Sequence, residues 1–477
     1  MIFLAALLAT SPFALEAADW KNAMFGAAIP SLSIAGVRDE TVVTEQTFGA
    51  PAKPIYQIGF LSRLPALVSL FQLVDAKKIS LDQPVNRYLK TVKVPKPDFT
   101  GTRDVRVRDL LLGQSGYDIY KFPGGSQSLS ELLSAYKPVS APGEKVARSA
   151  MNEAILQQLL VDTEGAPYID IIQKRVFAPL KLTSTFASQP TGAAFAASAM
   201  KPQSYPALAA QGLWSSAGDL AKLVAEIMRG ASGESKLISK ASGNLMLTEL
   251  REGATHGLNR DGTGEVFLGG HDEGYTGMFK LRPQDGTAVV VLTSSNFGWP
   301  LITPLIEAQF TKLSQIQPGE STASFEPRWA TGVYAGKDIC PVCEYGLLPM
   351  ALVWVQNLSD DEIIAAAQAL QATATADPKT RLKPFVVFSN LAGNLAATVT
   401  KAKELAARAN TPSVPFVVVK DPLAGTLRSF YIDRQSKSLF LTADKRSVKT
   451  VIANPDWANK ESTAKVSLAI DSMLGAK

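Results

Sequence analysis

Residues 58–89 read IGFLSRLPALVSLFQLVDAKKISLDQPVNRYL, and this stretch decides the fold assignment. It predicts a helix that starts near Phe60 and is followed by a turn. Side chains three positions apart share a helix face, so Phe60 and Arg63 are neighbours. Ser62 lies about 200° of rotation from Phe60 and points away from that face. The helix therefore begins with an aromatic ring beside a guanidinium group.

The stretch resembles the active-site helix of the β-lactamase and penicillin-binding-protein family, in the branch of class C β-lactamases, esterases and D-aminopeptidases. That family carries Gly-Ser-x-Ser/Thr-Lys here, whereas this chain has Phe60 at the serine and Arg63 at the lysine. Other landmarks follow in family order: IPSLSIA (29–35), VRVRDLLLGQSGY (105–117), PGEK (142–145), FAPLKL (177–182), QGLWSSAGDL (211–220) and Gly270-His271. The resemblance implies an α/β (α+β) fold over residues 28–310, with an antiparallel sheet flanked by helices plus a helical subdomain.

The first family motif has lost the groups that acyl transfer requires. This chemistry needs an activated hydroxyl and a group that moves its proton. Phe60 has no hydroxyl, and the guanidinium of Arg63 stays protonated and cannot act as the base. We therefore expect no serine nucleophile at this helix.

The second and third motifs have changed as well. The family's Tyr-x-Asn corresponds to Arg148 and Ala150, with Ser149 between them. The third motif retains His271, but Glu273 replaces the small residue that lets substrate lie against the strand. A histidine without a nucleophile or base partner makes no catalytic unit. We expect no catalytic residues at the family positions Phe60, Arg63, Arg148, Ala150, His271 and Glu273.

The altered pocket has two interpretations. In the favoured one, Phe60 fills the space of the lost serine while Asp272 and Glu273 neutralise Arg63 and Arg148, because buried charges need partners. In the other, Arg63, Arg148 and His271 bind an anionic ligand such as a peptide carboxylate.

Composition excludes several classes of protein. The 477 residues are 46% hydrophobic and 19% charged, with a net charge of +5 and no basic run interleaved with aromatics. Nucleic-acid binding has no support in this pattern, and no cofactor is expected. The length favours two domains. The sequence does not indicate an oligomeric state.

The N-terminal run MIFLAALLA and the small residues that follow it resemble a secretory signal peptide over residues 1–18. The run is too short for a membrane span. We expect export, to the periplasm or the cell exterior; the alternative is a buried N-terminal helix in a cytoplasmic protein. No other segment is long and apolar enough to cross a bilayer.

A second domain is predicted after a Pro/Gly/Ser-bearing linker. The expected boundaries are 19–315 for the hydrolase-like domain, 316–327 for the linker and 328–477 for the second domain. Strands are expected at 350–355, 384–388 and 416–419, helices at 360–374 and 395–409, a hairpin within 429–442, and a closing helix from Lys460. Alternating strands and helices followed by a hairpin and helix resemble a thioredoxin-like domain.

The only cysteines, Cys340 and Cys343, form a Cys-x-x-Cys motif. Beside a βαβ pattern this motif indicates a thioredoxin-like redox site, and Pro415 resembles the cis-proline that faces such cysteines. The pair precedes the first apolar strand, however, so a structural disulfide or an incidental thiol pair is an equal alternative. No metal site is expected, because a structural zinc site takes four ligands.

Three functions follow from these features. The first is a catalytically silent, exported binding or assembly protein whose partner is a peptidoglycan-type peptide, the substrate class that the resemblance implies, or another protein. The second is a thiol–disulfide oxidoreductase that uses Cys340 and Cys343. The third is a hydrolase with an unconventional nucleophile, Ser62 or Ser149.

Overall fold

A computed structural model describes residues 24–26, 28–49, 54–96, 102–122, 128–190, 195–196, 198, 200–250, 253–376, 381–420, 430 and 436–475. The expected signal peptide, residues 1–18, lies outside these ranges. The chain divides into two compact units, residues 1–311 and 312–477.

The first unit is built on an antiparallel sheet with strand order β2-β1-β9-β8-β7-β6. Its strands are β1 (Leu32–Arg38), β2 (Thr41–Phe48), β6 (Asn259–Arg260), β7 (Val266–Asp272), β8 (Tyr275–Arg282) and β9 (Thr287–Thr293). A smaller sheet joins β3 (Tyr56–Gln57), β5 (Trp214–Ser215) and β4 (Thr185–Phe186). The central strands β1 and β9 are buried along their whole length, which indicates that both faces of the large sheet are covered.

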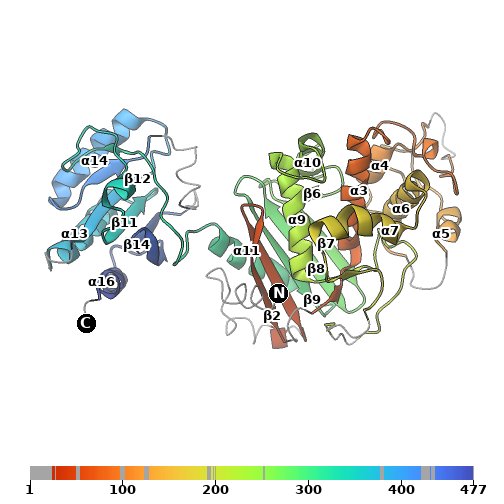
Figure 1. Ribbon diagram of the computed structural model, residues 1–477, viewed down its shortest axis with the longest axis horizontal. Helices are drawn as coiled ribbons and strands as arrows, with labels where there is room; N and C mark the ends of the chain where they lie inside the picture. Colours follow the sequence, from red (N-terminus) through yellow and green to blue (C-terminus); the bar gives the residue numbers. More distant parts are fainter. Residues whose placement is uncertain are drawn as a thin grey trace. The chain divides into compact units, whose positions relative to one another are not determined.

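The first unit also contains helices (Figure 1). They are η1 (Gly59–Ser62), α3 (Arg63–Asp75), η2 (Val85–Arg87), α4 (Val107–Leu111), α5 (Leu129–Ala135), α6 (Ala150–Glu164), α7 (Tyr168–Ile172), the π-helix η3 (Gln173–Phe177), α8 (Ala178–Leu180), α9 (Ala217–Ser232), α10 (Lys240–Leu247) and α11 (Trp299–Leu313). α9 packs on β1, β2 and β9. α11 lies against the other face, where Glu307 pairs with Arg282 of β8 and the Arg282 guanidinium stacks on Phe310.

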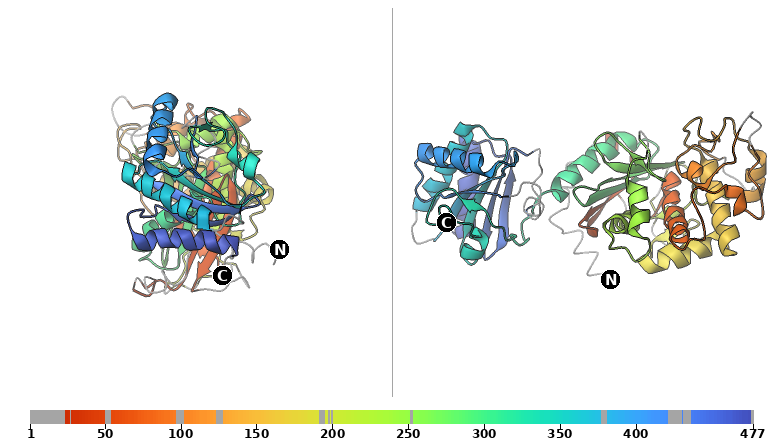
Figure 2. Two further views of the ribbon diagram at one scale, coloured as in Figure 1. Left: turned by 90° about the vertical axis from the view of Figure 1, so that its left-hand side faces the viewer. Right: turned by 90° about the horizontal axis from the view of Figure 1, so that it is seen from above.

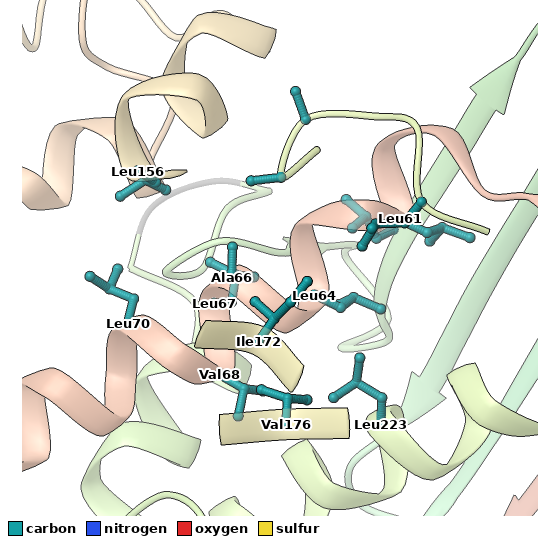
Figure 3. Packing of buried hydrophobic residues seen from close by; sticks show 14 of the residues in the cluster. Leu61, Leu64, Ala66, Leu67, Val68, Leu70, Leu156, Ile172, Val176 and Leu223 are labelled. Carbon is teal, nitrogen blue, oxygen red and sulfur yellow. The ribbon is translucent and has the colours of Figure 1, made fainter. Parts of the chain in front are cut away.

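Helix α3 is the centre of the core of the first unit. Most of its residues are buried, because other helices surround it. Figure 3 shows Leu64, Leu67 and Val68 of α3 among side chains of neighbouring elements, including Ile172 and Val176. Each fully buried aliphatic side chain contributes roughly 1.5–3 kcal/mol to folding. The packing therefore fixes the position of η1 and Arg63, which lie at the start of this helix.

The second unit contains one sheet with strand order β10-β13-β12-β11-β14-β15. Its elements are β10 (Arg328–Trp329), α12 (Pro341–Tyr345), β11 (Met350–Val355), α13 (Asp360–Ala376), β12 (Lys383–Phe388), α14 (Leu395–Ala409), β13 (Phe416–Val418), β14 (Ser438–Asp444), β15 (Ser447–Ala453) and α16 (Lys460–Leu474). β11, β12 and β13 are parallel, while β14 and β15 form an antiparallel hairpin. The strands and helices expected before this hairpin are present. The described hairpin lies at residues 438–453, while residues 429 and 431–435 of the range expected for it, 429–442, lie outside the described residues.

The two faces of this second sheet are covered differently. Helices α13, α14 and α16 pack on one face (Figure 1, Figure 2). On the other face, the strand side chains pack with Ile316, Phe325, Trp329 and Val342. Residues 316–327, expected to be a linker, thus belong to the second unit, and Thr322 donates its backbone N–H to the Arg446 carbonyl.

Candidate functional site

Gly59 brings the start of α3 against strand β7. Its φ of +52° is a conformation that glycine adopts without strain, and a Cβ there would lie 2.4 Å from the carbonyl oxygen of His271. This close approach holds η1 on the backbone of β7. Phe60 is therefore fixed next to His271, at the place where the sequence expected an emptied catalytic site.

Arg63 forms a buried ion pair with Glu153 of α6. Its Nε lies 3.0 Å from Glu153 Oε1, and its Nη2 donates to the Leu111 carbonyl at 3.2 Å. Burial raises the pKa of Glu153 against the opposing pull of the Arg63 charge. The expectation that Asp272 or Glu273 neutralises Arg63 is wrong, because α6 supplies the carboxylate. The sequence carried no signal for this partner, which lies 90 positions further along the chain.

Phe60 lies between two guanidinium groups. The Arg63 Cζ is 5.6 Å from its ring centroid and the Arg148 Cζ is 5.3 Å away. Both distances are within the range of cation–π attraction. Arg148 is exposed, and no carboxylate in the described ranges lies within 4.0 Å of its guanidinium nitrogens. Its charge is thus available to a ligand, whereas that of Arg63 is not.

Asp272 is paired with two groups that the sequence analysis missed, Tyr205 and Lys121. The Tyr205 hydroxyl donates to Asp272 Oδ1 at 2.6 Å, and Lys121 Nζ lies 3.9 Å from the same oxygen and 3.8 Å from Glu273 Oε1. Burial raises the pKa of Asp272, although the Tyr205 hydrogen bond and the Lys121 charge oppose this. Asp272 and Glu273 therefore face Lys121 and not the two arginines.

His271 is half-buried at the end of β7. Burial and the nearby Lys121 charge lower the pKa of its imidazole, while its hydrogen bond with Asn296 acts in the opposite direction. The ring is therefore neutral at neutral pH and offers hydrogen bonds in place of a permanent charge.

The two serines considered as alternative nucleophiles are buried. Ser62 Oγ accepts the Leu213 backbone N–H at 3.2 Å, and Ser149 Oγ accepts that of Ile119 at 3.1 Å. Ala150, at the position of the family's asparagine, begins α6 and is also buried. A substrate could reach neither hydroxyl without displacing the surrounding chain.

A small pocket of about 50 Å³ lies over Phe60. Its walls combine aromatic rings, two cationic side chains, a histidine and small residues: Phe60, Tyr120, Lys121, Arg148, Ala210, Gln211, Gly269, His271 and Trp299. A space of this size holds a few water molecules or a small charged group, but not a whole peptide. Tyr120 is 67% exposed and Trp299 38%, so the rest of a ligand would lie over these two rings.

The cysteines lie in the second unit, where Cys340 immediately precedes α12 and Cys343 is part of it. Both thiols are free, and the backbone N–H of Cys343 donates to Cys340 Sγ at 3.1 Å. Pro415 immediately precedes β13 and packs near Gly332. The described residues contain no cis peptide bond, so the cis-proline that the thioredoxin resemblance implies is absent at Pro415.

In the described part of the chain, no group of three or more His, Cys, Asp or Glu residues is arranged to hold a metal ion. None of the described helices has the length and apolar character needed to traverse a lipid bilayer.

Comparisons with known proteins concern the first unit. The family model described as Beta-lactamase matches residues 17–303. Teichoic acid D-alanine hydrolase of Staphylococcus aureus is 25% identical over 134 residues, or 28% of this chain and 32% of that protein. The chain thus spans about a third of the length of the curated relatives it matches.

Solved structures support the same fold. The octameric penicillin-binding protein homologue from Pyrococcus abyssi aligns with a TM-score of 0.52 and 22% identity, covering 59% of this chain and 73% of that one. FmtA from Staphylococcus aureus aligns with a TM-score of 0.51 and 19% identity, covering 63% and 90% respectively. At these identities the likeness concerns the fold alone.

Proposed function

The chain belongs to the beta-lactamase family. We propose that its first unit is a catalytically silent binding domain of the cell envelope. The observation that carries the proposal is the buried Arg63–Glu153 pair beneath Phe60. At the family's nucleophile and lysine positions, the chain presents an aromatic ring and a cation already held by a carboxylate. Neither Phe60 nor Arg63 can act as the nucleophile or accept its proton.

The remaining charges in the pocket favour an anionic ligand. Arg148 has an exposed guanidinium, Lys121 is only loosely paired at 3.8–3.9 Å, and His271 adds a neutral hydrogen-bonding group. A guanidinium binds a carboxylate through two parallel hydrogen bonds, which gives both affinity and orientation. The proposed ligand-binding residues thus differ from those expected from the sequence at one position: Lys121 takes the place of Arg63.

The ligand class is proposed from the relatives and from the pocket together. By its name, teichoic acid D-alanine hydrolase acts on the D-alanine of teichoic acid. We infer that this chain is exported and binds a peptidoglycan-type peptide through its terminal carboxylate. The small pocket fits this role because it admits the carboxylate while the peptide lies outside.

The first test separates catalysis from binding. The purified protein is incubated with a fluorescent penicillin, a chromogenic cephalosporin and a p-nitrophenyl ester, and intact mass and turnover are measured. We expect neither an adduct nor turnover above a heat-treated control. An acyl adduct would overturn the proposal, and mapping the modified peptide would identify the nucleophile.

The second test measures muropeptide binding by calorimetry at low and high salt. We expect binding that weakens with salt and falls about tenfold or more in Arg148→Gln and Lys121→Gln, since a hydrogen bond to a charged group contributes about 1.5–3 kcal/mol. Lys145→Gln is the matched control, because it removes one exposed positive charge outside the pocket. Equal loss in all three variants would indicate non-specific attraction.

A second candidate function is thiol–disulfide exchange in the second unit. It is favoured by the contact between the Cys343 N–H and Cys340 Sγ, which places two free thiols in one turn. The order of elements from β11 to α16, alternating strands and helices followed by a hairpin and helix, also supports the proposed thioredoxin-like character. Alkylation of the wild-type thiols no faster than that of free cysteine at neutral pH would exclude this function.

A further inference from the structure

The two thiols of the second unit differ in accessibility. Cys343 is exposed, whereas Cys340 is half-buried against the apolar cluster on the sheet face opposite α13, α14 and α16. Thiol–disulfide exchange requires the attacking sulfur to approach the target disulfide closely, so its rate depends on access as well as on thiolate fraction. Of the two residues, Cys343 is therefore the more accessible to a disulfide on another molecule.

The surroundings of Cys343 favour its thiolate. Ser324 Oγ lies 3.3 Å from its sulfur, and hydrogen bonds with Cys340 and Ser324 together with the Arg446 charge lower the pKa of the Cys343 thiol. Glu326 is the charged group that acts in the opposite direction. Arg446 belongs to the β14–β15 turn and packs against Gly346, one residue beyond α12.

Cys340 is arranged for the second step of an exchange. Burial raises the pKa of its thiol, which keeps it protonated in the resting protein. The Cys343 backbone N–H donates to its sulfur at 3.1 Å and would stabilise a thiolate there once the proton leaves. The same contact holds the two residues within one turn of chain, close enough for Cys340 to reach a disulfide formed on Cys343.

We propose that Cys343 is the attacking thiol and Cys340 the resolving thiol, so that the second cysteine of the motif reacts first. The inference rests on the second candidate function. The Cys343 thiolate attacks one sulfur of a substrate disulfide, forms a mixed disulfide and releases the other substrate sulfur as a thiolate. Cys340 then gives its proton to the released substrate thiolate and attacks Cys343 Sγ, which expels the second substrate thiolate. The substrate gains two electrons, and the two protein thiols become a Cys340–Cys343 disulfide. A small-molecule dithiol then reduces this disulfide.

The test traps the intermediate in the full-length protein with oxidised glutathione as the disulfide. Cys340→Ser retains the attacker and lacks the resolver, so we expect it to accumulate a glutathione adduct at least tenfold faster than Cys343→Ser. Wild type should end as the internal disulfide without an adduct, as read by intact mass. Faster trapping by Cys343→Ser would overturn the order while leaving the exchange function intact. If neither variant reacts faster than free cysteine, both the order and the function fail.

Arg446 supplies a second, independent readout. In the Cys340→Ser background, Arg446→Gln should slow adduct formation at pH 7 by about threefold and move its pH profile upward, since a neighbouring cation stabilises the thiolate. Lys445→Gln is the matched control, because Lys445 is also exposed, occupies the same turn and, like Arg446, has a positive φ. Arg446→Lys should restore the rate. Equal effects of the two glutamine variants would remove Arg446 from the proposal.

Discussion

Single residues decide what remains of the family's chemistry in this chain. The sequence predicts that Phe60 removes the hydroxyl and that Arg63 replaces a group that can give up its proton with one that cannot. Both stay predictions, and each depends only on residue type at a position recognised by resemblance. The partner of Arg63 was mispredicted, since Glu153 reaches it only through the packing of α6 on α3.

The buried pair gives the first prediction. Glu153→Gln should destabilise the first unit by about 3–5 kcal/mol, because it leaves the Arg63 charge buried without a counter-charge. Chemical denaturation measures the loss. The double variant Arg63→Met/Glu153→Leu should recover most of it, since two apolar side chains remove both charges together. Equal stability of the single variant and wild type would show that the pair is not desolvated.

Asp272 gives a prediction with a defined pH dependence. Burial raises its pKa in the folded state, so its contribution favours folding at low pH and is lost as pH rises through the folded-state pKa. Asp272→Asn removes this titration. The stability of the variant relative to wild type should therefore increase from pH 4 to pH 7, as measured by urea unfolding at each pH.

Glu131→Gln provides the control of opposite sign. Hydrogen bonds from the Ser128 backbone and side chain lower the pKa of Glu131, so its contribution to stability grows as pH rises from the folded-state pKa through the ordinary range of a carboxyl and is complete above that range. The glutamine variant should lose stability relative to wild type over the same interval. Two rising slopes would contradict the assignment for Glu131, and two falling slopes would contradict that for Asp272.

At the scale of elements, the strength of local signals decided which predictions hold. The strand at 350–355 and the helix at 395–409 match their expected bounds, because apolar runs and helical periodicity mark them directly. The position of the described hairpin depends on register with β11, where Leu441 of β14 pairs with Leu352, and local sequence does not give this register. The pocket likewise depends on elements far apart in sequence, which is why Lys121 and Tyr205 were missed.

The contact between η1 and β7 gives the prediction at this scale. Gly59→Ala should cost about 2–4 kcal/mol, because the alanine would adopt a positive φ and its Cβ would meet the His271 carbonyl oxygen. Gly262→Ala is the control, as no atom lies within 4 Å of the added carbon and its φ is unstrained; we expect a change within about 0.5 kcal/mol. Thermal unfolding of both variants provides the comparison. A tolerated Gly59→Ala would mean that η1 can move away from β7.

At the scale of the whole molecule, the two units carry separate cores. In the described ranges, the large cluster around α3 draws on residues 35–292, and the two clusters flanking the second sheet draw on residues 316–470. A domain with its own core can unfold on its own. This separation also means that a binding function in one unit and a thiol function in the other can be tested by substitutions that leave the other core intact.

Calorimetry of the full chain should therefore show two transitions. Leu352→Ala removes a fully buried side chain of β11 and should lower the stability of the second unit by about 2–5 kcal/mol while leaving the transition of the first unit in place. Leu468→Ala in the same unit should change neither transition, because that side chain is 66% exposed. Hydrogen exchange would assign each transition, with β11 and β12 losing protection in Leu352→Ala before β8 and β9. One cooperative transition that moves as a whole in Leu352→Ala would show instead that the stabilities of the two units are coupled.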